Sequence, residues 1–416
     1  MKDAVAFVGR ASLLSAIVWA GAVSAGPRDP FAETRSRMVD RFVRAEGITD
    51  EAVLEAMRAV PRHAFVATKD RARAYFDIPL PIGYGQTISP PYIVGYMTAA
   101  IAPQRGDRVL EVGTGSGYQA AVLAAMGAEV YSIEIVEPLA RQAEKTLDRL
   151  GYDGVHVRAG DGYLGWPEAA PFDRVIVTCS PEDVPRPLVD QMAEGGRMIV
   201  PLGERYQQAF YLFTKTDGRL VEEQLLPTLF VPMTGESEKR RDVQPDPLAP
   251  AVVNGGFELD VNGDGRADGW HYQRNTTLAE REEGGTFLSI ATDEPGTLAQ
   301  ALQGFPVDGR KIGGLDFQML VRAADVRPGR ENTASPSVLV HYFDSTRRPL
   351  GLGRVGPWRD TPQWRPIRHR VAVPQAAREA VIAVGLHGAT GRLDVDEIRF
   401  TAVPRYGVPR PPARPK

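Results

Sequence analysis

Three glycines with single-residue spacing are the strongest chemical signal in this chain of 416 residues. Gly113, Gly115 and Gly117 stand directly after the apolar run 109–112 and before a helix-forming run at 119–126. Glycine lets the backbone turn sharply and lets a ligand approach the main chain closely. The free N–H groups at the start of a helix then favour an anionic or polar ligand. This order of strand, glycine turn and helix predicts a site for a cofactor that carries adenosine.

The spacing of the glycines sets aside two common nucleotide sites. A dinucleotide fingerprint needs a glycine at the last position of G-x-G-x-x-G, where this chain has Tyr118. A P-loop needs a lysine followed by serine or threonine after its last glycine, and this loop has neither. The sequence therefore favours an adenosine cofactor of another kind, and an ordinary strand-to-helix turn is the alternative.

Acidic residues accompany three predicted strands. Glu111 lies inside the first strand, Glu134 closes the strand at 129–133, and Asp161 follows the strand at 156–159. Ligands of open α/β sheets bind at the carboxyl ends of the strands, and an acid after the second strand accepts hydrogen bonds from ribose hydroxyls. The residues predicted to hold the cofactor are Glu111, Gly113, Thr114, Gly115, Gly117, Glu134, Asp161 and Gly162.

The elements around the loop alternate between strand and helix patterns. A buried-strand pattern at 172–178, a helix pattern at 183–192 and a strand pattern at 197–201 follow in order. Such alternation predicts an α/β fold, with a doubly wound, Rossmann-like parallel sheet that is covered on both faces. Two strand patterns at 209–213 and 223–231 have no helix between them and predict an antiparallel edge.

Four segments carry a more specific signal. They are 85–92 (GQTISPPY), 109–124 (VLEVGTGSGYQAAVLA), 176–185 (IVTCSPEDVP) and 230–235 (FVPMTG). Together they resemble the class I methyltransferases that use S-adenosylmethionine (SAM), and more narrowly the protein-L-isoaspartate O-methyltransferases, over residues 38–236. The glycine loop is shared by many methyltransferases, whereas the segment GQTIS is far more specific to this family.

The resemblance implies that the methyl group of SAM moves to the free carboxylate of an L-isoaspartyl residue in a damaged protein and so initiates its repair. Ser89 matches the active-site serine of the family, and Thr87 lies in the loop beside it. The resemblance also implies that Glu134 binds the ribose and Asp161 the adenine edge. A free carboxylate titrates at about pH 4 and needs no general base, so few catalytic side chains are required. Local sequence alone also allows Ser89 to be the N-cap of the helix at 92–101.

Composition and single residues limit the remaining classes of function. The chain is 43% hydrophobic, which suffices for two cores, and its net charge of −3 argues against nucleic acid as a partner. The single cysteine, Cys179, excludes an intrachain disulfide and is expected to shape the pocket rather than to act as a nucleophile. His63 is expected to be structural. No apolar run is long enough for a transmembrane anchor in the mature chain.

The N-terminus and the family resemblance point to different compartments. Residues 1–25 combine Lys2 and Arg10, an apolar stretch at 11–23 and a small-residue cleavage pattern that ends at Ala25, which is typical of a signal peptide. Export to the periplasm would follow, whereas the family is cytoplasmic, where SAM is made. The sequence leaves the localisation open.

Composition changes after the predicted methyltransferase domain at 31–236. A charged, proline-rich linker is expected at 237–250, and a proline- and arginine-rich, disordered tail at 404–416. Between them, 251–403 contains several short strand patterns with turn signals, which predict an all-β sandwich. The segments 254–258 (NGGFE) and 393–398 (LDVDEI) resemble jelly rolls of the carbohydrate-binding-module type, for which a glycan or cell-envelope ligand is one expectation, although the resemblance says little about the ligand. The predicted strands are 286–290, 314–321, 337–343, 380–386 and 391–400.

One loop of this second domain alternates side-chain oxygens around a glycine. Asp260, Asn262, Asp264 and Asp268 match the start of a calcium loop, D-x-N-x-D-G. The glutamate that closes an EF-hand loop is replaced by His271. Calcium bound by a loop of another type and a solvated turn are both open.

The sequence thus predicts a SAM-dependent protein carboxyl methyltransferase with isoaspartyl proteins and peptides as substrates, joined to a binding domain. Two alternatives stay open at this point. One is a methyltransferase of the same fold that acts on another peptide carboxylate. The other is a cell-envelope binding protein in which the methyltransferase domain is a degenerate scaffold.

Overall fold

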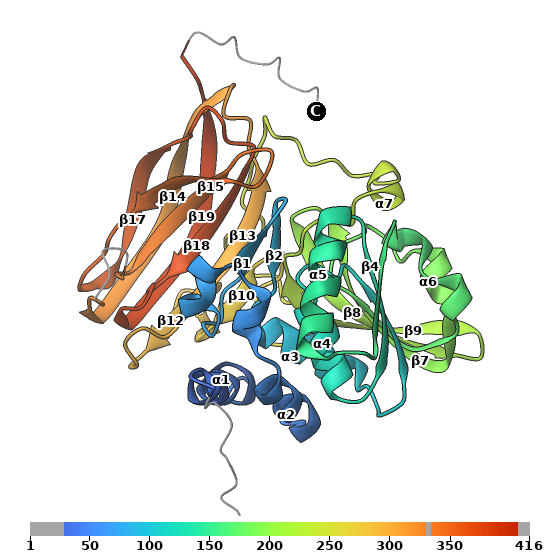
Figure 1. Ribbon diagram of the computed structural model, residues 1–416. Helices are drawn as coiled ribbons and strands as arrows, with labels where there is room; N and C mark the ends of the chain where they lie inside the picture. Colours follow the sequence, from blue (N-terminus) through green and yellow to red (C-terminus); the bar gives the residue numbers. More distant parts are fainter. Residues whose placement is uncertain (1–28, 330–333, 407–416) are drawn as a thin grey trace, which may run out of the picture.

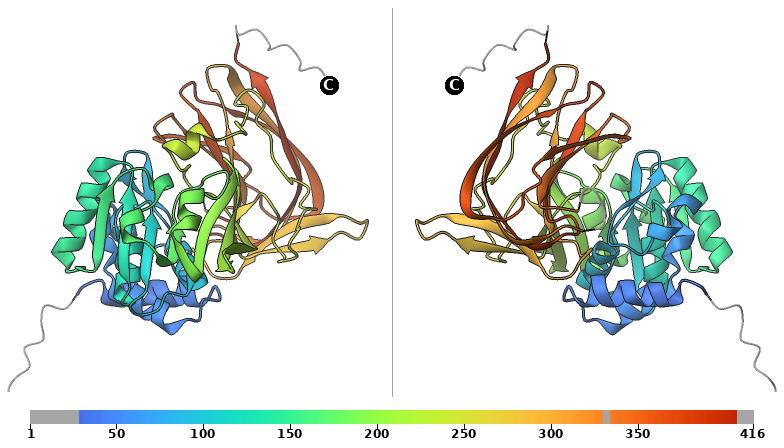
Figure 2. Two further views of the ribbon diagram at one scale, coloured as in Figure 1. Left: turned by 90° about the vertical axis from the view of Figure 1, so that its right-hand side faces the viewer. Right: turned by 90° about the vertical axis from the view of Figure 1, so that its left-hand side faces the viewer.

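The computed structural model describes residues 29–329 and 334–406. It contains an N-terminal α/β domain and a C-terminal β-sandwich that lie side by side (Figures 1 and 2). Their buried residues form separate hydrophobic cores, within 38–233 and 257–400 respectively. The predicted signal peptide at 1–25 lies outside the described residues, as does the end of the chain after Tyr406.

A seven-stranded sheet forms the centre of the first domain, in the order β5-β4-β3-β6-β7-β8-β9. Strands β3 to β7 pair in parallel, whereas β8 and β9 pair antiparallel at one edge. The predicted doubly wound sheet with an antiparallel edge is confirmed. The strands are β3 (Arg108–Val112), β4 (Glu129–Glu134), β5 (Val155–Ala159), β6 (Phe172–Val177), β7 (Met192–Glu204), β8 (Gln207–Thr216) and β9 (Arg219–Thr228).

The central strand β3 is buried on both faces, as a parallel strand between two layers of helices should be. Val109 belongs to the core that contains residues of α3 and α4, whereas Leu110 and Val112 belong to the core that contains Leu188 of α6. None of the described helices is long and apolar enough to span a membrane. The helices are α1 (Ala32–Val39), α2 (Glu51–Ala59), α3 (Pro91–Ile101), α4 (Tyr118–Ala125), α5 (Glu137–Leu150), α6 (Arg186–Asp190) and α7 (Glu236–Lys239).

The helix predicted at 183–192 is shorter than expected. Only Arg186–Asp190 is helical, because Pro185 stands at its N-cap and the chain enters β7 at Met192. The carbonyl of Gln191 accepts a hydrogen bond from the N–H of Phe172 at 2.9 Å, which commits the chain to the sheet at this point.

The second domain consists of two five-stranded antiparallel sheets, as predicted for a sandwich. Their orders are β10-β13-β18-β15-β16 and β11-β12-β19-β14-β17. The five strands predicted from the sequence correspond to β12, β14, β15, β18 and β19, and the other five were missed. The strands are β10 (His271–Arg274), β11 (Thr276–Glu280), β12 (Thr286–Thr292), β13 (Gln300–Pro306), β14 (Ile312–Arg327), β15 (Ser337–Phe343), β16 (Pro349–Val355), β17 (Thr361–Ala372), β18 (Glu379–Gly385) and β19 (Thr390–Pro404).

Both segments predicted to be irregular are partly ordered. The linker at 237–250 begins inside α7, and the buried Arg241 donates to the carbonyl of Ser180 at 3.0 Å, which holds the linker against the first domain. The first residue of the predicted tail, Pro404, is also the last residue of β19. The next residue, Arg405, donates a hydrogen bond to the carbonyl of Val373 at 2.6 Å. A guanidinium group can satisfy several carbonyls at once, which composition alone does not reveal.

The predicted calcium loop is a turn in which side chains bind the backbone. Asp260 accepts hydrogen bonds from the N–H groups of Asp264 and Gly265 at 3.0 and 2.9 Å, and Asp268 accepts one from Val261 at 2.8 Å. Across residues 29–329 and 334–406, no group of three or more His, Cys, Asp or Glu side chains is arranged to hold a metal ion. The structure therefore gives no support to a calcium site.

Candidate active site

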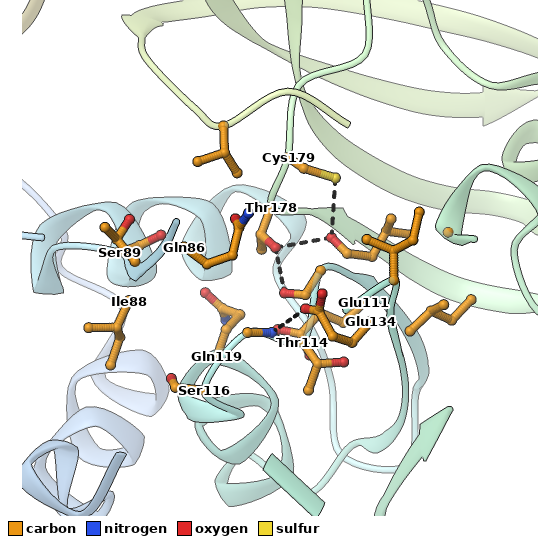
Figure 3. Close-up of a pocket in the computed structure, with 18 of the residues that line it drawn as sticks. Gln86, Ile88, Ser89, Glu111, Thr114, Ser116, Gln119, Glu134, Thr178 and Cys179 are labelled. Atoms are coloured by element: carbon orange, nitrogen blue, oxygen red, sulfur yellow. Dashed lines mark hydrogen bonds between the residues drawn. The ribbon is translucent and has the colours of Figure 1, made fainter. Parts of the chain in front are cut away.

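A cleft lies at the carboxyl ends of the parallel strands β3, β4 and β6. One wall is the glycine loop with the acids of β3 and β4, and the opposite wall is the segment 86–89, which includes β2 (Gln86–Ile88) (Figure 3). The cleft brings together most of the residues predicted from the sequence. Those that line it are Thr87, Ser89, Glu111, Gly113, Thr114, Gly115, Glu134 and Gly162.

The first glycine of the loop makes a close contact that only glycine permits. Gly113 has φ +102°, and a Cβ atom there would lie 2.4 Å from the hydroxyl oxygen of Thr178. That hydroxyl group lies 2.7 Å from the carbonyl oxygen of Gly113 and 3.0 Å from that of Val112, so it fixes the start of the loop (Figure 3). Sequence reasoning did not assign Thr178 to the site, although its place at the end of a predicted strand was a usable signal.

Glu111 is a fully buried acid with no basic partner. Its Oε2 accepts a hydrogen bond from the hydroxyl of Ser132, which lies 2.5 Å from the hydroxyl of Thr114. Its Oε1 has no hydrogen-bond partner in the described part of the chain. Burial raises the pKa of Glu111 to about 8. An orphaned carboxyl oxygen in the wall of a cleft fits a cationic ligand group, such as the ammonium group of SAM.

Glu134 lines the cleft, as its predicted place beside the ribose requires, whereas Asp161 lies outside the lining. The two oxygens of Glu134 accept hydrogen bonds from the N–H groups of Gly115 and Val136 at 2.8 and 2.9 Å. A carboxylate accepts more than two hydrogen bonds, so ribose hydroxyls have free acceptor positions. Asp161 accepts from the N–H groups of Tyr163 and Glu236 at 3.0 and 2.8 Å and does not line the cleft. Gly117 also lies outside its lining.

Ser89 is not the N-cap of the helix that follows it. Helix α3 begins at Pro91 with Pro90 at the N-cap, and neither supplies a capping side chain. The carboxylate of Asp77 accepts the hydrogen bond from the N–H of Tyr92 instead, at 2.9 Å. Ser89 lines the cleft. Among the described residues no hydrogen bond holds its hydroxyl group, so this group is available to a substrate.

Two further residues behave as the sequence predicted. Cys179 lines the cleft, and burial raises the pKa of its thiol well above the usual range, so the sulfur is a weak nucleophile. His63 lies outside the lining of the cleft, where its ring packs against Phe31 and its Nδ1 lies 2.6 Å from the hydroxyl of Tyr75. Neither residue supplies a base or nucleophile to the cleft.

Comparison with known proteins places this site in a family. The family model for protein-L-isoaspartate(D-aspartate) O-methyltransferase matches residues 33–238. A protein-L-isoaspartate O-methyltransferase from Opitutus terrae is 54% identical over 228 residues, which are 55% of this chain and 98% of that protein. The chain belongs to this family. A second relative of the same name, from Gloeobacter violaceus, is 55% identical over 48% of this chain and 98% of its own length.

The methyl donor of this family is SAM, and the sandwich domain lies outside the family match. Among solved structures, a putative protein-L-isoaspartate O-methyltransferase from Plasmodium falciparum, in complex with S-adenosyl-L-homocysteine, is 26% identical. It covers 48% of this chain and 98% of its own, with a TM-score of 0.44. The glycan or envelope ligand expected for the sandwich is not supported by these comparisons.

Replacement of Gly113 by alanine should weaken SAM binding by about tenfold or more, because the new Cβ meets Thr178 and the φ of +102° strains any other residue. Isothermal titration calorimetry with SAM measures the loss. Gly106→Ala is the matched control, since Gly106 has φ +87° with open space around its Cβ and does not line the cleft. Equal SAM affinity in the two variants would contradict this account of the loop.

Replacement of Glu111 by glutamine should remove a pH dependence of stability. The carboxyl group titrates near 4.5 when exposed and near 8 when folded, so wild-type stability falls as pH rises between these values. The difference from Glu111→Gln should reach on the order of 5 kcal/mol above pH 8, at about 1.4 kcal/mol per pKa unit. Urea unfolding of the SAM-free protein at several pH values measures it. Saturating SAM should flatten the wild-type curve, and identical pH slopes for both proteins would contradict the assignment.

Proposed function

We propose that the domain at 33–238 transfers the methyl group of SAM to the free carboxylate of L-isoaspartyl residues in proteins, and that Ser89 orients that carboxylate. One observation carries the proposal: the cleft places the glycine loop and Glu111 on one wall and the segment 86–89 on the other. A donor held by the first wall and a carboxylate held by the second would meet inside the same cleft. Alignment of the reacting groups is the main task of such a site.

The chemistry of the cleft suits a substrate that is already ionised. An exposed carboxyl group titrates at about pH 4, so it reaches the site as a nucleophile at neutral pH. The residues of this chain therefore have to bind and orient it and to exclude water, and no side chain has to remove a proton. SAM supplies an electrophilic methyl group on a sulfonium sulfur, which is a good leaving group. The hydroxyl of Ser89 can donate a hydrogen bond to the carboxylate.

A degenerate scaffold is not favoured by the same residues. Such a domain would be free to lose the buried acid at Glu111, whose burial is costly without a ligand. Another peptide carboxylate as the substrate differs from the proposal only in the groups around the carboxylate. We therefore keep the isoaspartyl residue, which the relatives' name specifies, as the substrate of this proposal.

The proposal predicts methyl transfer from labelled SAM to a peptide that contains L-isoaspartate and none to the same peptide with L-aspartate. The two peptides differ only in the position of the backbone link, so the comparison isolates the shape of the carboxylate site. Scintillation counting of base-labile methyl esters measures both. A protein that binds SAM but methylates neither peptide would overturn the repair assignment, and equal methylation of both would support the broader carboxylate substrate.

Ser89→Ala should lower kcat for the isoaspartyl peptide by about tenfold or more, because a hydrogen bond to a charged group contributes about 1.5–3 kcal/mol. The dissociation constant of SAM should change little. Ser116→Ala, on the cofactor wall of the same cleft, is the control and should weaken SAM binding without lowering kcat at saturating SAM. An equal loss of SAM affinity and kcat in Ser89→Ala would make Ser89 a structural residue.

A further inference from the structure

The first strand of the sandwich reaches into the methyltransferase domain. In β10, the buried His271 has its Nε2 3.1 Å from the carbonyl oxygen of Tyr206, and Tyr272 packs against the core of the first domain. Arg274, at the end of β10, is only 4% exposed. Figure 1 shows β10 between the sandwich and the N-terminal elements. The two domains therefore share a buried junction built by one short strand.

Arg274 is the charged residue at the centre of this junction. Its guanidinium carbon lies 3.8 Å from the centroid of the Tyr92 ring, which is a cation–π contact. Its Nη2 lies 3.6 Å from Oδ2 of Asp77, which is also 4% exposed, and its Nη1 lies 3.8 Å from Oε2 of Glu46. A buried cation requires such counter-charges, because water no longer solvates it.

Asp77 connects this junction to the segment 86–89, which forms one wall of the cleft. Its second oxygen accepts the hydrogen bond from the N–H of Tyr92, near the start of α3. The first N–H groups of a helix need an acceptor, and Pro90 at the N-cap offers none. Ser89 stands just before Pro90 and Pro91, whose rings fix φ at both positions. The position of Ser89 therefore follows the position of the helix start, which Asp77 holds.

The sandwich also contacts the other end of the same segment. Strands β1 (Leu80–Gly83) and β2 form a hairpin whose tip contains Gly85, with φ +71°. A Cβ atom on Gly85 would lie 3.0 Å from the backbone oxygen of Thr346, in the turn between β15 and β16. The segment from Asp77 to Tyr92 is thus held by the second domain both at its hairpin tip and at the helix that follows.

We propose that the sandwich domain positions the substrate wall of the active site, and that Arg274 is the positioning residue through which it acts. The proposal rests on the proposed function for the role of Ser89, but the contact chain from Arg274 through Asp77 to Tyr92 stands on geometry alone. Arg274 touches neither the cleft nor the glycine loop. Its loss should therefore disturb the substrate wall and leave the SAM wall intact.

The test compares Arg274→Met with Arg274→Lys in the full-length protein. Arg274→Met should lower kcat/KM for the isoaspartyl peptide by about tenfold or more, since a displacement of about 1 Å at a reactive group can cost about a hundredfold. The dissociation constant of SAM should stay within about twofold, and Arg274→Lys, which keeps the charge, should restore part of the activity. Amide hydrogen exchange of the peptide segment 77–92 should accelerate in Arg274→Met.

Arg41→Gln is the matched control at the same domain boundary. Arg41 donates to Thr297 at 2.6 Å and lies 3.6 Å from Glu294, but both contacts are exposed. This variant should leave kcat/KM and exchange at 77–92 unchanged. Asp77→Asn keeps an acceptor oxygen for Tyr92 and removes the charge, so its effect combined with Arg274→Met should be less than the sum of the two.

Three results would overturn the proposal: a loss of SAM affinity as large as the loss of kcat/KM, unchanged exchange at 77–92, or additive effects of Arg274→Met and Asp77→Asn. Hydrogen exchange does not depend on turnover. A wild-type protein without isoaspartyl activity would therefore defeat the proposed function and still leave the positional coupling open to measurement. If Arg274→Met does not fold, Arg274→Lys and Asp77→Asn carry the same comparison.

Discussion

A carboxyl group buried without a basic partner is the constraint on which the cofactor wall depends. Glu111 lies on β3, the middle one of five parallel strands in a sheet covered on both faces, and its side chain is fully buried behind the wall of the cleft. The hydroxyl of Ser132, which is itself hydrogen-bonded to that of Thr114, donates to one of its oxygens, and the other has no partner among the described residues. The raised pKa of about 8 corresponds to the free-energy cost of burying the charged form of this carboxyl group. A ligand with a cationic group offsets part of that cost, so this acid favours such a ligand in the cleft.

The two walls of the cleft are built in different ways. The cofactor wall stands on the ends of parallel strands in a seven-stranded sheet, where the neighbouring strands fix each position. The substrate wall stands on a two-stranded hairpin, β1 and β2, which has little stability on its own. Buried side chains of Leu80 and Ile88 attach this hairpin to the core. The remaining support comes from Asp77 at the start of α3 and from the sandwich domain at Gly85.

The sequence was sufficient to predict the cofactor wall because its residues obey a topological rule. The carboxyl ends of parallel strands meet at one edge of the sheet, so Glu111, the glycines and Glu134 had to be neighbours. The rule does not say which N–H groups compete for a strand-end acid. Asp161 follows its strand as Glu134 does and likewise accepts two backbone hydrogen bonds, but only Glu134 lines the cleft. Thr178 and the Asp77 cap were missed because both act through contacts between segments distant in sequence, and a local pattern assigned the cap to Ser89 instead.

In the sandwich, the strands predicted from the sequence have mostly buried residues. Strand β17 was missed because it is an exposed edge strand, rich in arginine and proline, without a clear alternation of apolar and polar residues. The same limit applies to β10, whose four residues are too few for a pattern. The functional consequence of β10 could not be predicted because it depends on burial in another domain.

The junction between the domains contains a buried ion pair, Arg274 with Asp77. The Opitutus terrae relative matches this chain over 98% of its own length and only 55% of this one, so the catalytic fold does not in general require a sandwich. In this chain Asp77 is buried at the junction, and burial raises its pKa. A buried carboxylate needs counter-charges: the first domain supplies the buried Arg62, whose charge lowers the pKa of Asp77, and the sandwich supplies Arg274, which lies 3.6 Å from the carboxylate. The ion pair at the junction is for this reason also the contact that links the second domain to the substrate wall.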